Sequence, residues 1–325
     1  MTLSIFFLQK DTVKKQESSL LWGILGGGFG LYGYLPALVN TNQLRVLIHK
    51  KNQPFLESRS DLTKYIPYVE FVGRLDDIFT ADSLVFSVLP GIQEEIVRQL
   101  GSDKKYKKIV LEKPLSLSPS SSDDVLEKAI ALADSVRVGY SFVDSYWGNL
   151  VREKNILKMP GEYQINWMFL AHHFRLNPSS WKIRHDMGGG VLRFYGIQLL
   201  AYLASIGEAD VEYSKVFNDK NQNATRWHAS FKIINGARVI VCLDTNSRVE
   251  CFDFYSLEGE SKFKFNVPSP FFFEKAEETQ DKRISVLEKV LESLDLNNAP
   301  YYGFYRRVNK LWSDLEKVTV WEVCD

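Results

Sequence analysis

Residues 21–38, which read LWGILGGGFGLYGYLPAL, constrain the fold of this chain more than any other segment. An apolar run leads into Gly26, Gly28 and Gly30, and a helical pattern follows these glycines. A strand, a tight glycine turn and a helix in this order are typical of a dinucleotide-binding βαβ unit. Gly26 would make the turn, Gly28 would let a pyrophosphate approach the backbone, and the helix N-terminus would face the phosphate charge. The third fingerprint position carries Leu31, which predicts looser packing of the helix on the strand unless Gly30 or Gly33 compensates.

Short apolar runs alternate with helical patterns over the first 140 or so residues, which predicts βαβ units and a parallel sheet. The expected strands are 21–25, 44–48, 69–72, 83–89, 108–111 and 137–141, and the expected helices are 33–39, 92–100 and 123–134.

Beyond residue 206 the pattern changes to several apolar–polar alternations in succession, which is typical of a mainly antiparallel sheet. These strands are expected at 211–217, 225–234, 237–244, 249–255 and 262–267, with helices at 188–206, 280–294 and 301–318. We therefore expect an α/β chain with an N-terminal Rossmann-like parallel sheet and a C-terminal α+β domain built on an open, mainly antiparallel sheet. The expected parts are an N-terminal arm (1–19), a dinucleotide-binding Rossmann domain (20–143) and a substrate-binding and oligomerisation domain (144–325).

The bulk composition argues against several classes of function. Forty basic residues balance forty acidic ones, so no overall field attracts nucleic acid or a membrane surface. No apolar stretch approaches the roughly twenty residues of a membrane helix, and the opening segment lacks the positive region of a signal peptide. The three cysteines, Cys242, Cys251 and Cys324, have no metal-ligand spacing and suit a reducing cytoplasm. We expect a cytoplasmic protein with no metal, nucleic-acid or membrane partner.

A second informative segment, KKIVLEKPL, places Lys113 at the end of an apolar strand. Ligands of an open α/β sheet bind at the carboxyl ends of its strands, so Lys113 is expected to point into a cleft. A lysine that is desolvated there can have its pKa pulled toward neutrality and can carry a proton in catalysis.

Five segments in order resemble the Gfo/Idh/MocA oxidoreductase family, and the resemblance covers nearly the whole chain. They are the glycine turn Gly26–Gly30, the strand SLVFSVLP ending at Pro90, the run Glu112-Lys113-Pro114, VGYSF from Val138, and Gly188–Gly190. The resemblance implies a first domain that binds NAD or NADP and a second domain for substrate binding and oligomer contacts, with sugars, nucleotide sugars or polyols as substrates. It implies cofactor contacts from Gly26, Gly28, Phe29, Gly30, Leu89, Pro90, Gln93, Glu112 and Lys113, with Lys113 holding cofactor and substrate. An exposed sheet face needs a partner to cover its apolar side, so we expect a homodimer or homotetramer.

Four polar positions depart from the family pattern. Phe194 and Gln198 stand where the family typically has an Asp and a proton-transferring His after the triple glycine. Gln93 replaces a His that commonly follows the fourth strand, and Val143 replaces an Arg after the VGY segment. Neither a phenylalanine ring nor a glutamine amide acts as a general base near neutral pH.

Two hypotheses therefore stay open. In the first, the chain is an NAD(P)-dependent oxidoreductase that transfers hydride between nicotinamide and a carbinol or ketone carbon of a sugar or nucleotide sugar. Its candidate catalytic residues are Lys113, Tyr195 and Gln198, and its candidate substrate contacts are Lys113, Tyr140, Trp181, Lys182, Arg184 and Gln198. In the second, the chain is catalytically impaired and acts as a binding or regulatory protein. The adjacent His172 and His173 are expected on a strand, with at most one facing the cleft.

The end of the second strand indicates the cofactor. An acidic residue there would bind the ribose 2′-hydroxyl of NAD, but this chain has His49, Lys50 and Lys51 instead. Positive charge suits the 2′-phosphate of NADP, so the sequence favours NADP over NAD and adds His49 and Lys50 to the cofactor-binding candidates.

Overall fold

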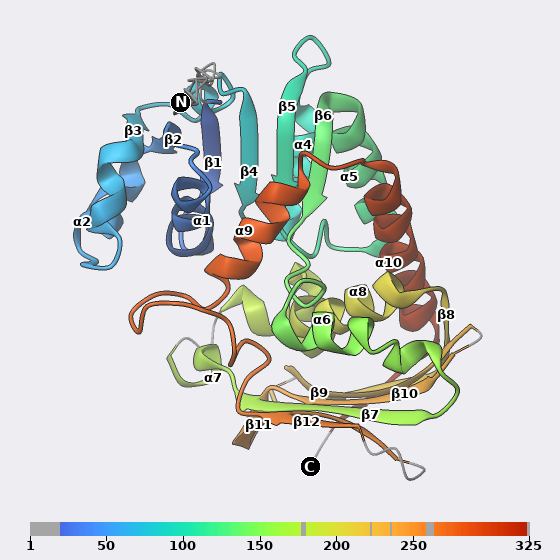
Figure 1. The fold of residues 1–325 in the computed structure, drawn as a ribbon. Helices are drawn as coiled ribbons and strands as arrows, with labels where there is room; N and C mark the ends of the chain where they lie inside the picture. Colours follow the sequence, from blue (N-terminus) through green and yellow to red (C-terminus); the bar gives the residue numbers. More distant parts are fainter. Residues whose placement is uncertain (1–19, 177–179, 222, 235, 258–262, 324–325) are drawn as a thin grey trace, which may run out of the picture.

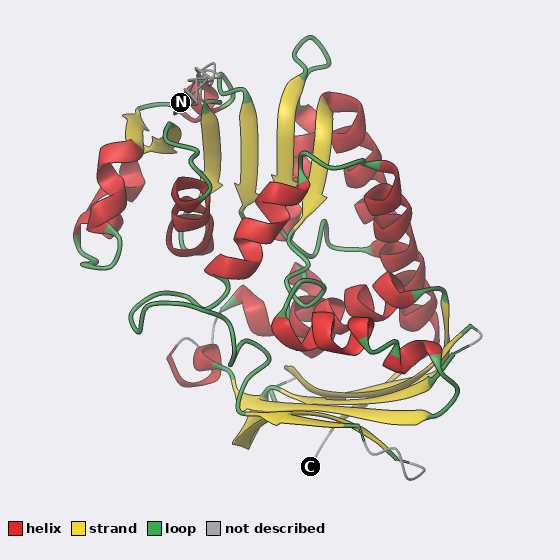
Figure 2. Ribbon diagram, in the orientation of Figure 1, coloured by secondary structure: helices red, strands yellow, loops and turns green. Residues whose placement is uncertain are grey.

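A computed structural model of the chain describes residues 20–176, 180–221, 223–234, 236–257 and 263–323. A parallel sheet and a second, mixed sheet lie at opposite ends of the molecule, with helices packed between them (Figure 1, Figure 2). The expected arm 1–19 and Cys324 lie outside the described residues.

The first sheet has six parallel strands in the order β3-β2-β1-β4-β5-β6, as a Rossmann-like domain requires. Its strands are β1 (Trp22–Gly26), β2 (Val46–His49), β3 (Val69–Val72), β4 (Ser83–Ser87), β5 (Tyr106–Leu111) and β6 (Ala133–Val138). The strand order reverses between β1 and β4, which pair directly in parallel. A ligand crevice is expected where the order reverses, outside the carboxyl ends of these two strands.

Five helices belong to the connections of this sheet: α1 (Leu35–Asn40), α2 (Gln53–Glu57), α3 (Leu75–Ile78), α4 (Pro90–Gln99) and α5 (Pro119–Leu132). A π-helical turn over Gly30–Tyr34 leads into α1. The chain returns to this sheet much later through α9 (Ile284–Ser293), which packs against α1. Leu287 and Leu291 of α9 are buried in one apolar cluster with Leu31 and Leu35. The expected boundary at residue 143 therefore stays a prediction, because part of the first unit's core comes from beyond it.

The second sheet has seven strands in the order β12-β11-β7-β10-β9-β8-β13. They are β7 (Glu162–Leu170), β8 (Ala209–Asn218), β9 (Ala224–Ile233), β10 (Arg238–Asp244), β11 (Asn246–Ser256), β12 (Lys264–Val267) and β13 (Thr319–Val323). Only the pairs β7–β10 and β8–β13 are parallel, so the expected mainly antiparallel sheet is confirmed. Neither β7 nor β13 is among the predicted strands. The remaining helices are α6 (Tyr146–Glu153), α7 (His172–Leu176), α8 (Ile197–Ile206) and α10 (Ala299–Val318).

Helix α10 joins the two halves of the molecule. It contacts α5 of the first unit as well as α8 and β8 of the second. Phe304, Val308, Leu311 and Trp312 lie on one buried face of this helix, at the spacing of an amphipathic helix. They belong to a single apolar cluster that runs from Phe86 of the first sheet into the second sheet. The two sheets therefore share a continuous core.

Arg137 fixes the connection between α9 and α10 to the first sheet. Its guanidinium donates to the Ser293 hydroxyl, to the Leu296 carbonyl and to Asn298 Oδ1, at 2.9, 3.2 and 2.8 Å. The side chain is 1% exposed and lies 3.7 Å from the centre of the Tyr301 ring. Because a buried arginine needs several acceptors, these contacts hold the end of α9 and the start of α10 against β6.

Candidate active site

A cavity of about 580 Å³ lies at the carboxyl ends of β1, β4, β5 and β6, where the strand order of the first sheet reverses. The first unit lines it with the glycine turn after β1, with residues 87–89 after β4 and with Glu112 and Lys113 after β5. The opposite wall comes from later in the chain, from His172, Trp181, Lys182, Phe194 and Gln198, and from Arg283 and Leu287 at the start of α9.

The glycine turn presents bare backbone to this cavity. Gly26 has a φ of 113°, and a Cβ added there would lie 2.1 Å from the Ser87 carbonyl oxygen, so only glycine fits. Nothing lies within 4 Å of the corresponding point on Gly28. The Asn52 amide donates a 3.0 Å hydrogen bond to the Gly26 carbonyl and steadies the turn. Open backbone beside a helix start suits a pyrophosphate, so these residues fit a dinucleotide.

Lys113 is the central titratable group of the cavity. Its Nζ donates a 2.7 Å hydrogen bond to the Phe194 carbonyl oxygen and lies 4.0 Å from the centre of the Phe194 ring. Burial lowers the pKa of Lys113 to about 7, with the Glu112 carboxylate opposing this shift and Arg283 and Lys182 adding to it. At neutral pH the amine is therefore poised to give up or take a proton.

Glu112 forms a pair with Tyr34 behind Lys113. The Tyr34 hydroxyl donates a 2.6 Å hydrogen bond to Glu112 Oε1, and burial raises the pKa of both groups. A Cβ on Gly139 would lie 2.4 Å from Glu112 Oε1 and 2.5 Å from the Tyr34 hydroxyl. The glycine of the VGYSF segment thus makes room for this pair.

Gln93 holds the backbone of the Glu112–Leu115 segment and is itself 1% exposed. Its Nε2 donates to the carbonyl oxygens of Glu112 and Leu115 at 2.8 and 2.9 Å, and its Oε1 accepts from the Glu112 N–H at 3.0 Å. Gln93 therefore positions the backbone on both sides of Lys113.

Gln198 also bonds to backbone groups. Its Oε1 accepts from the Phe142 N–H at 3.4 Å, and its Nε2 donates to the Gly139 carbonyl at 3.5 Å. Both of these contacts are on the segment after β6. The Gln198 amide lines the cavity as a neutral polar group, on the same wall as Lys113 and Phe194.

Arg283 brings positive charge to the glycine turn from the far end of the chain. Its guanidinium lies 4.1 Å from the centre of the Phe29 ring and makes two hydrogen bonds with the Asp281 carboxylate, at 2.9 and 2.7 Å. The sequence gives little sign of this role, because Arg283 stands in a mixed run of charges before α9. Lys113, Lys182 and Arg283 lie on the cavity wall with one carboxylate, that of Glu112. Because Arg283 is already paired with Asp281, the surplus of positive charge that favours an anionic ligand comes from the two lysines.

No protein-family model and no curated protein sequence matches this chain. Solved structures do match. The 3-ketoreductase KijD10 from Actinomadura kijaniata, in complex with NADP and TDP-benzene, aligns with a TM-score of 0.67 at 10% identity, covering 94% of this chain and 99% of that one. The WlbA dehydrogenase from Bordetella pertussis, in complex with NADH and UDP-GlcNAcA, aligns at 0.69 and 11%, covering 92% and 96%. A super-repressor mutant of Gal80p from Saccharomyces cerevisiae aligns at 0.67 and 10%, covering 93% and 96%.

The chain has the fold of these proteins. The alignments extend over both sheets, so the Rossmann-like unit and the second unit occur together in all three. At sequence identities of 10 to 11%, the structural similarity shows the fold but not the activity.

The cavity brings together about half of the residues expected from the sequence. Those on its wall are Gly26, Gly28, Phe29, Leu89, Glu112, Lys113, Trp181, Lys182 and Gln198. Of the other expected residues, all of them described, Gly30, His49, Lys50, Pro90, Gln93, Tyr140, Arg184 and Tyr195 are not on this wall. Their assignment to the site stays a prediction.

The expected residues away from the wall have other contacts. Tyr140 is buried against Phe304 and Tyr305, and Tyr195 packs against Trp167. Burial raises the pKa of both tyrosines, which makes their hydroxyls poor proton donors at neutral pH. Arg184 forms an exposed ion pair with Asp186.

The expectation that His172 and His173 lie on a strand is wrong. The strand β7 ends at Leu170, and the two histidines begin the short helix α7. His172 lines the cavity while His173 is buried behind it, where burial lowers its pKa to about 4. A helix turn places them on different sides, as a strand would have done.

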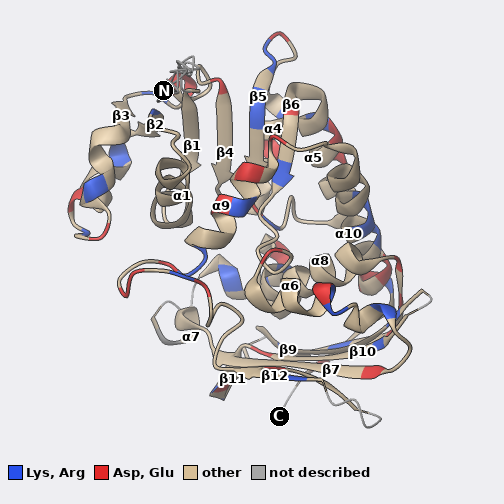
Figure 3. Cartoon of the chain, in the orientation of Figure 1, with Lys and Arg blue, Asp and Glu red and all other residues tan. Residues whose placement is uncertain are grey.

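Charged residues of both signs are spread over both units (Figure 3). Within the described ranges, no helix combines the length and apolar character that crossing a bilayer demands. The same ranges hold no cluster of His, Cys, Asp or Glu side chains suited to a metal ion.

Proposed function

We propose that this protein is an NAD(P)-dependent oxidoreductase that acts on a sugar or nucleotide sugar. The observation that carries the proposal is the position of Lys113: its amine, with a pKa lowered to about 7, faces a cavity that also contains the open glycine turn. The solved structures of the same fold support it, since two of them are a ketoreductase and a dehydrogenase in complex with nicotinamide cofactors.

Different residues of the cavity would bind the cofactor and transfer the proton. Gly26, Gly28 and Arg283 would hold the pyrophosphate of the cofactor, by backbone approach and by charge. When bound, the nicotinamide supplies or accepts the hydride at the substrate carbon. In the reducing direction the Lys113 ammonium gives its proton to the substrate oxygen, so a carbonyl becomes a hydroxyl. In the oxidising direction the neutral amine takes that proton back.

We propose a preference for NADP. Lys50 and Lys51 are exposed immediately after β2, in the short turn that ends at Asn52, whose amide binds the glycine turn. Two positive side chains at this place suit a 2′-phosphate. Tryptophan fluorescence titrations with NADPH and NADH measure the preference. Lys50→Ala and Lys51→Ala should weaken NADPH binding about tenfold and leave NADH binding nearly unchanged, because one charge-assisted contact is lost in each variant.

The test of the oxidoreductase proposal is a screen of keto sugars and nucleotide keto sugars, followed by NADPH oxidation. Lys113→Met should lower kcat by about 10²- to 10⁴-fold while the protein still binds NADPH, since general acid–base catalysis contributes in this range. Lys310→Met, a surface lysine paired with Asp314, is the matched control and should keep full activity. Unchanged turnover in Lys113→Met would refute the assignment.

A second candidate function is binding or regulation without catalysis. Phe194 and Gln198 favour it, because neither side chain can transfer a proton at the positions they hold in the cavity. Gal80p, whose mutant is described as a super-repressor, has the same fold. Turnover of any keto sugar by the unmodified protein would exclude this alternative.

We propose that the chain self-associates through the face of the second sheet that the described helices leave uncovered (Figure 2). Ile240 and Cys242 of β10 and Met168 of β7 alternate with buried neighbours and are half exposed on this face. Light scattering after gel filtration measures the mass, and Ile240→Glu should convert a dimer or tetramer to the monomer.

A further inference from the structure

Lys182 lies on the cavity wall, in the short turn Trp181–Ile183. Its Nζ is 5.4 Å from the centre of the Phe194 ring, and Lys113 Nζ is 4.0 Å from the same centre. The amines of two lysines therefore lie against one aromatic ring.

Three arginines in this part of the fold each have a carboxylate partner. Arg184 pairs with Asp186, Arg193 with Glu316, and Arg283 with Asp281. Among the described residues, Lys182 and Lys113 have no such partner, and only Lys113 has a hydrogen-bond acceptor in its place, the Phe194 carbonyl oxygen. Its burial and the charge of Arg283 both lower its pKa. A half-buried ammonium without a counter-charge costs free energy, which a bound anion would offset.

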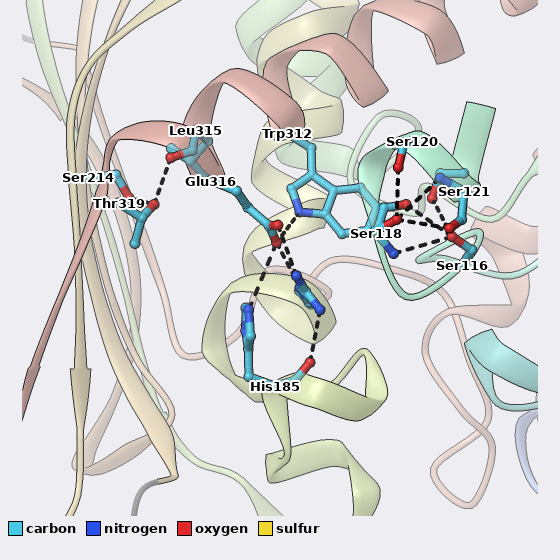
Figure 4. A network of polar contacts seen from close by, with 12 residues as sticks. Ser116, Ser118, Ser120, Ser121, His185, Ser214, Trp312, Leu315, Glu316 and Thr319 are labelled. Atoms are coloured by element: carbon cyan, nitrogen blue, oxygen red, sulfur yellow. Dashed lines mark hydrogen bonds and ion pairs between the residues drawn. The ribbon is translucent and has the colours of Figure 1, made fainter. Parts of the chain in front are cut away.

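The segment that carries Lys182 is firmly held. The Arg193 guanidinium donates to both carboxylate oxygens of Glu316 at 2.7 and 2.9 Å and to the His185 carbonyl at 3.2 Å. Trp312 Nε1 donates to Glu316 at 2.8 Å, so α10 and the loop around His185 are tied together (Figure 4). Backbone bonds from Arg184 N–H to the Trp181 carbonyl and from Gly189 N–H to the Arg184 carbonyl close the loop. Lys182 is thus presented from a fixed backbone.

We propose that Lys182 binds an anionic substituent of the substrate, a carboxylate or a phosphate, at the substrate end of the cavity beside Lys113. This inference rests on the proposed function, whose substrate class it narrows to acidic or phosphorylated sugars. The Trp181 ring meets the Phe194 ring edge-on at 5.3 Å and also lines the cavity, so an apolar wall for the sugar ring stands next to the charge.

Calorimetric titrations in the presence of NADP⁺ test the proposal without turnover. UDP-glucuronate against UDP-glucose isolates a carboxylate, and glucose 6-phosphate against glucose isolates a phosphate. The unmodified protein should bind the charged member of at least one pair about 10- to 100-fold more tightly, the range of one charge-assisted hydrogen bond. Lys182→Met should abolish this preference, Lys182→Arg should keep most of it, and Lys310→Met should leave it unchanged.

Equal affinities within both pairs, or a preference that survives Lys182→Met, overturn the proposal. Circular dichroism and the melting temperature confirm that each variant is folded. If the unmodified protein prefers the charged ligand but turns over no keto sugar, the anion site is supported and only the oxidoreductase function is contradicted. Normal cofactor binding by Lys182→Met would show that the anion bound by Lys182 is not a phosphate of the cofactor.

Discussion

The hydroxyl of Tyr34 donates a 2.6 Å hydrogen bond to Oε1 of Glu112, the residue immediately before Lys113. This bond lowers the pKa of the Glu112 carboxyl against the larger effect of burial, and the Glu112 charge in turn raises the pKa of Lys113. Tyr34 therefore acts on Lys113 through Glu112, as a positioning residue.

Glu112→Gln should move the pKa of Lys113 below its value of about 7, because the substitution removes the negative charge that opposes deprotonation. Tyr34→Phe should act in the same direction with a smaller effect. Carbon-13 NMR of the lysine Cε resonances against pH measures this directly. In ketone reduction, which needs the ammonium, the fall of kcat/KM with rising pH should begin at lower pH in Glu112→Gln. An unmoved Lys113 resonance in both variants would contradict this role for the pair.

Lys113→Met should raise the free energy of unfolding at pH 6 to 7. The Lys113 pKa is about 7 in the folded protein and 10.5 in a free lysine, so the folded state binds fewer protons between these values. Burying the charged Lys113 amine lowers the free energy of unfolding by its full amount below about pH 7. This loss becomes smaller as the pH rises toward 10.5, where the unfolded chain also gives up the proton. Urea titrations should show that Lys113→Met has a higher free energy of unfolding than the unmodified protein, and that this difference shrinks between about pH 7 and 10.5. Lys310→Met should show no such trend.

Gln93→Leu should destabilise the protein by about 2 to 4 kcal/mol, because two carbonyl oxygens and one N–H of the Glu112–Leu115 segment lose a buried partner. Gln99→Leu on the exposed side of the same helix is the control and should change stability by less than about 0.5 kcal/mol. Urea unfolding gives both values. A similar loss in the two variants would mean that the Gln93 contacts add nothing specific.

Gly139→Ala should displace the Tyr34–Glu112 pair, since the added methyl group would lie within 2.5 Å of both oxygen atoms. We expect a loss of about 1 to 3 kcal/mol in stability, as for other overpacked sites, together with a changed Lys113 pKa. Adding Tyr34→Phe removes one of the two clashing oxygens and should restore part of the stability. Gly73→Ala, where nothing lies within 4 Å of the added atom, is the matched control.

The parts of the fold that could be predicted from the sequence are those that depend on short motifs and on the spacing of apolar residues. The glycine turn after β1 and the residues Glu112 and Lys113 after β5 line the same cavity, because parallel strands bring their carboxyl ends to the same edge. The strand β7 is not among the predictions although its buried and half-exposed residues alternate. Arg283 could not be predicted, since it reaches the glycine turn only through the packing of α9 on α1.

Two tyrosines that were predicted as site residues do not line the cavity. Tyr140 and Tyr195 stand next to informative motifs, yet both pack against other rings and not on the cavity wall. Residue type and position along the chain do not say which way a ring turns, and burial of its apolar area decides that. Tyr34 behaves differently, because its hydroxyl found a carboxylate partner.

The packing of α9 on α1 also has a consequence for biosynthesis. Leu287 and Leu291 fill the same apolar cluster as Leu31 and Leu35, and Arg137 holds the end of α9 to β6. A nascent chain that has emerged only as far as β6 lacks α9, which forms one side of this apolar cluster. Its Leu31 and Leu35 are therefore exposed to water. The first core can therefore close only after α9 has been synthesised, about 150 residues after β6, and until then chaperones that bind exposed apolar segments can bind it.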